Sequence, residues 1–304
     1  MMSLKKIFID EQPREAGTHF PFFVIVVTIV QIALFIYTIV YNKGLTSMYE
    51  NPMAGPSSLT LTRNGAKFVP CMKPTQENDL RTTTACPSDI SFTNKTCTYE
   101  EYLWYLCNTD NLKGFPYQIY RLFIPIFLHA GIIHLVLNLV NQLAIGIILE
   151  HKFNSIRISI IYILSGIGGT LLSAIGLPQY SSVGASGALY GLLAVYFMDT
   201  IRNWRNLQKP WLILTFQGIF IIASLIIGIL IPIVDYMAHI GGFLLGILSG
   251  LVICPNLYWN ICKYDSPIQP KLIIMAGSSM FVIAFFLGGF IGFFRTTAPV
   301  YWLK

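Results

Sequence analysis

Apolar residues gather in seven long runs along the chain, and polar stretches separate them. A hydrocarbon core about 30 Å thick needs roughly 20 apolar residues in a helix. The runs predict membrane-spanning helices near 21–41, 130–149, 156–177, 183–198, 211–231, 234–253 and 271–294. The first run is too long for a cleaved signal peptide and lacks a small-residue cleavage site, so it is predicted to be a retained span. We therefore expect an all-α polytopic membrane protein.

Composition supports a membrane protein and argues against a soluble one. Hydrophobic residues make up 54% of the 304 residues and charged residues only 11%, against roughly 25% charged residues in soluble domains. The net charge is +6, but the basic residues lie in short segments between the apolar runs and form no continuous patch. Nucleic acid is therefore not an expected partner.

The positions of Lys and Arg indicate an orientation, because short cytosolic connections are rich in them. With a cytosolic N-terminus, the inner segments carry Lys5, Lys6, Arg14, Lys152, Arg157, Arg202, Arg205, Lys209, Lys263 and Lys271. The short outer connections, 178–182 and 232–233, carry no basic residue. We predict a cytosolic tail (1–20), a core (21–253) with a long extracytosolic loop (42–129), a cytosolic loop (254–270), a seventh helix (271–294) and an extracytosolic tail (295–304).

The long loop is expected to carry covalent modifications. It holds Cys71, Cys86, Cys97 and Cys107, which suggest two disulfides in an oxidising compartment with three possible pairings. Asn94 begins an Asn-Lys-Thr triplet, which is either an N-glycosylation site or an unmodified surface turn. Cys254 and Cys262, beyond the sixth run, are expected to be free thiols. Neither group of cysteines has the spacing of a zinc site, so neither a metal nor another cofactor is expected.

Among the polar side chains within the apolar runs, where polar groups are expensive and are candidates for function, four stand out. They are His134 and Asn138 in the second run, Ser186 in the fourth and His239 in the sixth. These three runs all cross from outside to inside, and each candidate lies near the start of its run. With a rise of 1.5 Å per residue, they share one depth below the outer surface. A nucleophile, a base and hydrogen-bond donors must converge in this way for acyl transfer.

Ser186 lies in the sequence Gly184-Ala185-Ser186-Gly187. Glycine removes side-chain bulk, so that a substrate backbone can approach Oγ and the chain can turn sharply into a helix. The run 183–198 is short, which predicts a helix that begins inside the membrane after irregular backbone beside a water-filled cavity. The alternative is a packing stripe of small residues. Both interpretations can hold together, because glycines in the fourth and sixth runs are spaced for close helix contact: Gly187, Gly191, Gly242, Gly246 and Gly250.

His239 is a candidate general base. Burial disfavours the charged form of an imidazole, so a neutral ring would accept the serine proton. A hydrogen bond to a neighbouring helix is the alternative. Asp235, four residues earlier, is expected to cap the helix, and no carboxylate lies deep enough for a third member. The sequence therefore predicts a Ser-His dyad.

His134 and Asn138 are four residues apart and share one helix face. Their N–H groups are candidate donors to the oxyanion of a tetrahedral intermediate, with interhelical hydrogen bonding as the alternative. His129 is expected to have a structural or water-contacting role.

These motifs resemble those of the rhomboid intramembrane serine proteases: His129-x4-His134-x3-Asn138, Gly184-Ala185-Ser186-Gly187 followed by Tyr190, and Ala238-His239-x2-Gly242-x3-Gly246. The resemblance covers 21–253 and implies a six-helix bundle, with 271–294 like the C-terminal addition of eukaryotic secretase-type members. It implies Ser186 as nucleophile, His239 as base, and an oxyanion site from His134, Asn138 and the Ser186 backbone N–H. It also implies that Tyr190 packs against His239. The family commonly has Trp-Arg where this chain has Tyr120-Arg121.

The resemblance implies a serine endopeptidase that cleaves single-span membrane proteins near the outer end of the helix. Its partners would be these substrates and membrane lipids, in the plasma membrane or an endomembrane. Rhomboid-like pseudoproteases lose the serine or the histidine, and this chain keeps both. A catalytically silent binder of membrane helices is the alternative. A small-solute transporter would show internal repeats, and the sequence shows no such symmetry.

Overall fold

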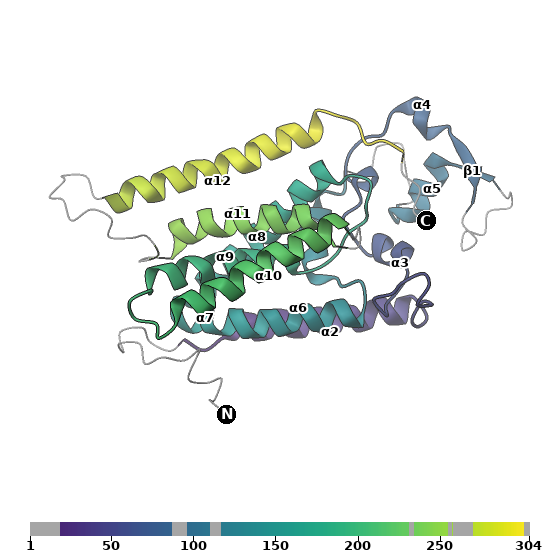
Figure 1. The fold of residues 1–304 in the computed structure, drawn as a ribbon. Coiled ribbons are helices and arrows are strands. Elements are labelled where there is room, and N and C mark those ends of the chain that lie inside the picture. The colour runs from purple at the N-terminus through teal and green to yellow at the C-terminus, as the bar shows by residue number, and fades with distance from the viewer. Residues whose placement is uncertain are drawn as a thin grey trace.

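The computed structural model of the protein describes residues 19–86, 96–109, 117–230, 234–254, 257 and 270–300. Long helices dominate these residues and run along one common direction (Figure 1). They are α2 (Phe22–Tyr41), α6 (Ile132–Asn141), which continues through the π-helical turn η4 (Gln142–Gly146) into α7 (Ile147–Phe153), α8 (Ser155–Gly176), α9 (Ser186–Arg202), α10 (Pro210–Leu230), α11 (Tyr236–Ile253) and α12 (Pro270–Phe294). A helix lies along each predicted run, with ends that differ from the predicted bounds by up to four residues, so the predicted all-α membrane fold is confirmed.

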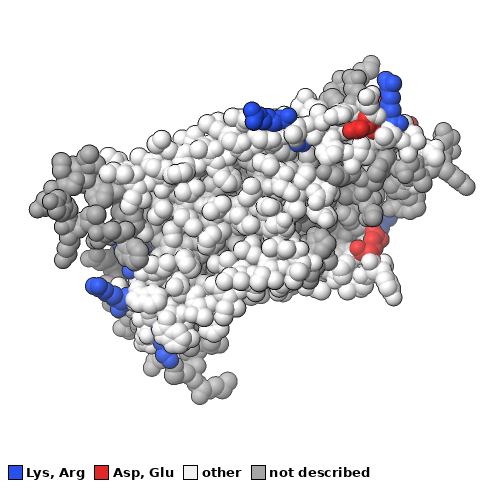
Figure 2. All heavy atoms as spheres, turned by 45° about the horizontal axis from the view of Figure 1, so that its top comes forward, with Lys and Arg blue, Asp and Glu red and all other residues white. Residues whose placement is uncertain are grey.

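Length and composition suit these helices to a bilayer. Six spans within the described residues are long and apolar enough to cross a membrane. α9 is shorter, with 17 residues, or roughly 25 Å of helix against about 30 Å of hydrocarbon. In Figure 2 the broad middle of the face shown carries no charged residue, and Lys, Arg, Asp and Glu lie around its edges. The expected short fourth helix is thus present in the structure.

The centre of the bundle is made by α8, α9 and α11. The apolar window of α8 is 61% buried, whereas those of α10 and α12 are 17% and 6% buried. Glycines let the central backbones touch: a Cβ on Gly242 would lie 1.9 Å from the carbonyl oxygen of Gly187, and one on Gly246 would lie 2.4 Å from that of Gly191. The predicted small-residue contact between the fourth and sixth runs is therefore confirmed, as membrane helices commonly show.

The long loop (42–129) folds at one end of the bundle (Figure 1). Its elements are α3 (Ser58–Arg63), η1 (Val69–Cys71), α4 (Glu77–Leu80), β1 (Thr83–Ala85), β2 (Thr96–Thr98), α5 (Tyr99–Leu106), η2 (Ile119–Leu122) and η3 (Ile124–Phe127). β1 and β2 form a small antiparallel ladder in which Thr84 faces Cys97. A disulfide joins Cys71 to Cys107 across 36 residues. Closing a loop of this length stabilises the fold by about 4 kcal/mol in the chain-entropy account.

Arg121 is fully buried and forms hydrogen bonds to other residues of the long loop. Its Nη1 donates to the carbonyl oxygens of Thr62 and Ala66, at 2.6 and 2.7 Å, and its Nε donates to Gln118 Oε1 at 2.6 Å. These bonds give donors to two buried carbonyls, of which that of Thr62 also accepts the Gly65 N–H at 3.2 Å. The arginine of the Tyr120-Arg121 pair is thus a structural anchor in this chain.

Candidate active site

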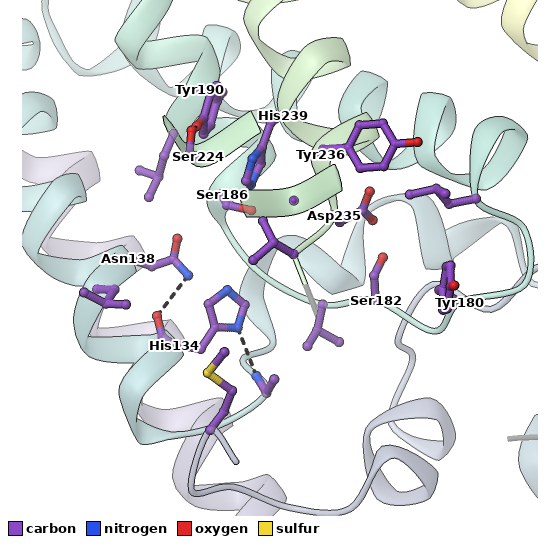
Figure 3. Close-up of a pocket in the computed structure, with 18 of the residues that line it drawn as sticks. His134, Asn138, Tyr180, Ser182, Ser186, Tyr190, Ser224, Asp235, Tyr236 and His239 are labelled. Atoms are coloured by element: carbon purple, nitrogen blue, oxygen red, sulfur yellow. Dashed lines mark hydrogen bonds between the residues drawn. The ribbon is translucent and has the colours of Figure 1, made fainter. Parts of the chain in front are cut away.

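A cavity of about 620 Å³ is lined in part by residues of the long loop and so lies at that end of the bundle. It is lined by α6, by the first turns of α9 and α11, by the second half of α10, and by parts of the long loop and of the segments 177–183 and 234–235. The structure brings together the four candidate residues, because His134, Asn138, Ser186 and His239 all line this cavity (Figure 3). Three helices therefore supply polar groups to one space.

Ser186 is the first residue of α9. The first amides of a helix have no partner within the helix and carry a partial positive charge. The chain approaches through irregular segment 177–185, where the Gly184 N–H donates to the Pro125 carbonyl at 2.9 Å. Gly184 has φ +138°, and a Cβ there would lie 2.6 Å from Cε1 of His134. Glycine is required at position 184 both for this backbone conformation and for the approach of the imidazole.

His239 lies in the first turn of α11, and three contacts hold this turn or the histidine ring in place. Asp235 caps the helix as predicted, since its Oδ1 accepts the Ala238 N–H at 3.0 Å. The Tyr190 ring stacks on the imidazole with centroids 4.2 Å apart and planes 7° apart. From α8, a Cβ on Gly169 would lie 2.5 Å from the Ala238 carbonyl oxygen, so the backbones of α8 and α11 touch beside the histidine.

The Ser186 hydroxyl points toward the His239 ring in Figure 3. Their neighbours are in contact, because a Cβ on Gly187 would lie 3.2 Å from the Ala238 carbonyl oxygen. Within the part of the chain that the structure describes, no hydrogen bond joins the hydroxyl to the imidazole, and His239 Nδ1 has no partner. Catalytic hydrogen bonds are often long before substrate binds and shorten in the complex. The arrangement is thus suited to proton transfer on substrate binding.

The long loop positions His134 by capping α6. The carbonyl oxygens of Ala54 and Met53 accept the N–H groups of Ile132 and Ile133, at 3.0 and 3.2 Å. These N–H groups belong to the first turn, which lacks helical acceptors. The start of α6, and with it His134, is therefore held by residues almost 80 positions earlier in the chain.

His134 and Asn138 can present donors to the cavity. The Ala130 N–H donates to His134 Nδ1 at 3.4 Å, so in the neutral ring the proton lies on Nε2. That nitrogen would be 2.9 Å from a Cβ on Gly184, two residues before Ser186. Asn138 Nδ2 donates to the His134 carbonyl at 3.0 Å, and its second N–H remains for another acceptor.

His129 is fully buried and lies edge-on to His134, with ring centroids 5.4 Å apart. This contact favours the structural role over the water-contacting one.

Sequence reasoning missed other residues near the site. The Tyr190 hydroxyl contacts the Ser224 hydroxyl of α10, and the position of Ser224 inside an apolar run was the signal that could have revealed it. Asp235 lines the cavity in addition to capping α11. Lys67, a fully buried lysine of the long loop, bonds Ser173 at 2.9 Å, and no sequence pattern marks a single lysine in a loop.

The cysteines agree in part with expectation. Cys71 and Cys107 form one of the two predicted disulfides. The second predicted disulfide is not formed in the structure, where the Cys97 side chain is instead hydrogen-bonded to that of Cys86. A covalent bond between these two residues in an oxidising compartment stays a prediction. Cys254 is a buried free thiol. Cys262 and Asn94 lie outside the described residues.

Residues 116–256 match the Rhomboid domain. The chain is 33% identical over 249 residues to Rhomboid-type serine protease 2 of Emericella nidulans, covering 75% of this chain and 48% of that protein. It is 34% identical over 250 residues to RHOMBOID-like protein 1 of Arabidopsis thaliana (77% and 53%). It is 41% identical over 167 residues to Inactive rhomboid protein 2 of Homo sapiens (55% and 19%).

The first two matches thus span about half the length of those relatives. The matched domain contains Ser186, His239, His134 and Asn138, which the structure gathers around one cavity. The chain belongs to the rhomboid family.

Proposed function

We propose that the protein is an intramembrane serine endopeptidase with a Ser186–His239 dyad. One observation supports this function above the others: a serine at the first position of α9 points toward a histidine of α11 inside the cavity. A packing role alone would require neither the cavity nor the absence of a partner on the histidine ring.

The side chains would act in the following order. Ser186 Oγ attacks the scissile carbonyl while His239 takes the hydroxyl proton, and the carbonyl oxygen becomes an oxyanion. His134 Nε2–H, the Asn138 amide and the Ser186 backbone N–H donate to that oxyanion. His239 then gives its proton to the leaving amine, and the C–N bond breaks. Water enters through the cavity and His239 assists its attack on the acyl-serine, which releases the new carboxylate and restores the enzyme.

The proposed substrates are single-span membrane proteins, cut near the outer end of the span. A transmembrane helix bonds its own backbone, so a peptide bond reaches Ser186 only after the helix opens locally. Gly lowers helix stability by roughly 1 kcal/mol and Pro by about 3 kcal/mol relative to Ala. Substrates should carry such residues in the outer part of the span, with a small residue before the cut. Replacing the helix-weakening residues by Leu should slow cleavage, and an unchanged rate with unchanged binding would exclude this basis for selection.

A serine-directed fluorophosphonate probe tests the function directly. Purified wild-type protein should be labelled and should cleave a membrane substrate in proteoliposomes. Ser186→Ala should abolish both results, and His239→Ala should abolish cleavage, while protein level and topology stay unchanged. Sustained cleavage by Ser186→Ala would end the serine-protease proposal.

The second candidate is a catalytically silent binder of membrane helices. It is favoured by the 41% identity to Inactive rhomboid protein 2 of Homo sapiens. A silent binder would retain a membrane protein without cutting it and would give equal probe signals for wild type and Ser186→Ala. The two candidates therefore predict opposite outcomes in the same assay.

We further propose that the N-terminus is cytosolic and that the long loop and the cavity face the extracytosolic side. The support is the uneven distribution of Lys and Arg between short connections. Endoglycosidase treatment should shift the mobility of wild-type protein but not that of Asn94→Gln. Labelling of the loop cysteines by a cytosol-restricted thiol reagent, after mild reduction, would reverse this orientation.

A further inference from the structure

Lys67 joins the long loop to the segment that leads to Ser186. It lies between α3 and η1, and its side chain is fully buried. Its N–H donates to the Ser182 carbonyl at 2.9 Å, and the Ser182 N–H donates to the Lys67 carbonyl at 3.0 Å. Because Ser182 lines the cavity, the backbone of Lys67 is attached to the wall of the candidate active site.

The side chain of Lys67 reaches a second part of the site through one hydroxyl. Its Nζ donates to Ser173 Oγ at 2.9 Å and to the Leu177 carbonyl at 3.0 Å. The Ser173 hydroxyl donates to Asp235 Oδ2. A serine hydroxyl has one proton and accepts through its lone pairs, so the order ammonium, hydroxyl, carboxylate satisfies every partner. A continuous chain of hydrogen bonds thus crosses from the loop through α8 to α11.

Asp235 links this chain to the catalytic histidine. Its Oδ1 accepts the Ala238 N–H at 3.0 Å, and its carbonyl oxygen accepts the His239 N–H at 3.2 Å. One carboxylate oxygen is therefore committed to the helix and the other to Ser173. Any shift of Asp235 moves the turn that carries His239.

We propose that Lys67 is a positioning residue for the proposed protease reaction. Through Ser173 it holds Asp235, and thereby the first turn of α11, in the orientation that directs His239 toward Ser186. The inference rests on the proposed function and extends it to a long-loop residue that does not contact the cavity's reacting groups.

The charge of Lys67 supplies a measurable signature. Burial lowers the pKa of its ammonium to about 8, and the carboxylate of Asp235 opposes this effect. Among the described residues, the carboxylate and the imidazole at the start of α11, which packs near this ammonium, are those of Asp235 and, one turn further on, His239. The two hydrogen-bond acceptors of the ammonium are the Ser173 hydroxyl of α8 and the Leu177 carbonyl of the segment that follows α8. Arg121 of η2 donates a hydrogen bond to the carbonyl of Ala66, the residue before Lys67.

This pKa makes stability and activity respond to pH in opposite directions. Folding lowers the pKa of Lys67 from 10.5 to about 8, so the unfolded chain binds the proton more tightly. The free energy of unfolding therefore rises with pH between these two values. The attraction of the ammonium for Asp235 weakens over the same interval, so activity should fall. A residue with only a structural role would make activity follow stability.

A matched pair of variants tests the proposal. Lys73 is a second buried lysine of the same loop, and its Nζ donates instead to the Phe293 carbonyl and Thr296 Oγ1, at 2.9 and 3.0 Å. None of these three residues lines the main cavity. Lys67→Met should lower kcat by about tenfold with KM within about twofold, the scale expected for losing a charged hydrogen bond. It should also remove the fall in activity above about pH 8. Lys73→Met should retain the wild-type kcat and pH profile.

Two further variants separate positioning from misfolding. Asp235→Asn retains a side-chain oxygen that can cap α11 but loses the charge, and Ser173→Ala removes the bridging hydroxyl. If the three residues act as one chain, Lys67→Met combined with Asp235→Asn should be no slower than the slower single variant. Additive losses, or an unaltered kcat and pH profile in Lys67→Met, would overturn the proposal.

Amide hydrogen exchange of the peptide covering 234–245 gives a readout that does not depend on cleavage. Exchange should be faster than wild type in Lys67→Met and Ser173→Ala and unchanged in Lys73→Met. If wild-type protein showed no protease activity, the proposed function would fail, and this measurement would still decide whether Lys67 holds the start of α11. Equal exchange in all four proteins would show that it does not.

Discussion

The contact between α9 and α11 sets how His239 is held against Ser186, and Gly242→Ala perturbs it. Gly242 lies three residues after His239, one turn along the same helix. A Cβ at this position would lie 1.9 Å from the carbonyl oxygen of Gly187 and 2.7 Å from its carbonyl carbon. Both atoms belong to the backbone of α9, so no side chain can rotate away. The methyl group must therefore push the two helices apart.

The size of the effect follows from these distances. Ordinary van der Waals contact begins at 3.4 Å, so α9 and α11 must separate by roughly 1.5 Å, and a misplacement of about 1 Å can lower a rate about 100-fold. Overpacking also costs typically about 1–3 kcal/mol of stability. We expect kcat to fall by about 100-fold, with a smaller change in KM, in protein that is still folded but melts at a lower temperature.

The assay is cleavage of a membrane substrate in proteoliposomes, with kcat and KM measured below the melting temperature of every variant. Gly218→Ala on α10 and Gly277→Ala on α12 are matched controls, because a Cβ at either position meets nothing within 4 Å. Both controls should retain wild-type kinetics. A Gly242→Ala protein with wild-type kcat would show that close contact of these helices does not position His239.

The oxyanion donors, the second disulfide and the loop anchor give three further predictions. His134→Ala and Asn138→Ala should each lower kcat by about 100- to 1000-fold with little change in KM, and unchanged turnover in both would return them to a packing role. Peptide mapping without reductant should find Cys86 linked to Cys97, whereas alkylation of both thiols in protein from an oxidising compartment would contradict this pairing. Arg121→Met should reduce the free energy of unfolding by about 1–3 kcal/mol, because the buried Ala66 carbonyl loses its donor and the Thr62 carbonyl keeps only the Gly65 N–H, and an unchanged melting temperature would refute the anchoring role.

The sequence by itself determined the spans and the depth of the candidate site. A bilayer requires apolar runs of nearly fixed length whose backbone is bonded internally, so the helices follow from composition alone. Depth follows from position along a run, because the rise per residue is constant. For this reason His134, Asn138, Ser186 and His239 could be placed at one level before any contact was known.

Only the tertiary structure decided which side chains meet. An apolar run fixes the length of a helix but not its rotation, because lipid accepts any apolar face. The pairing of Cys71 with Cys107, one of three possibilities, required the fold of the loop. The bonds from Lys67 through Ser173 to Asp235 join three segments that are remote in sequence. Such contacts depend on how closely the loop and the helices approach each other in space. No local pattern of residues in the sequence predicts that approach.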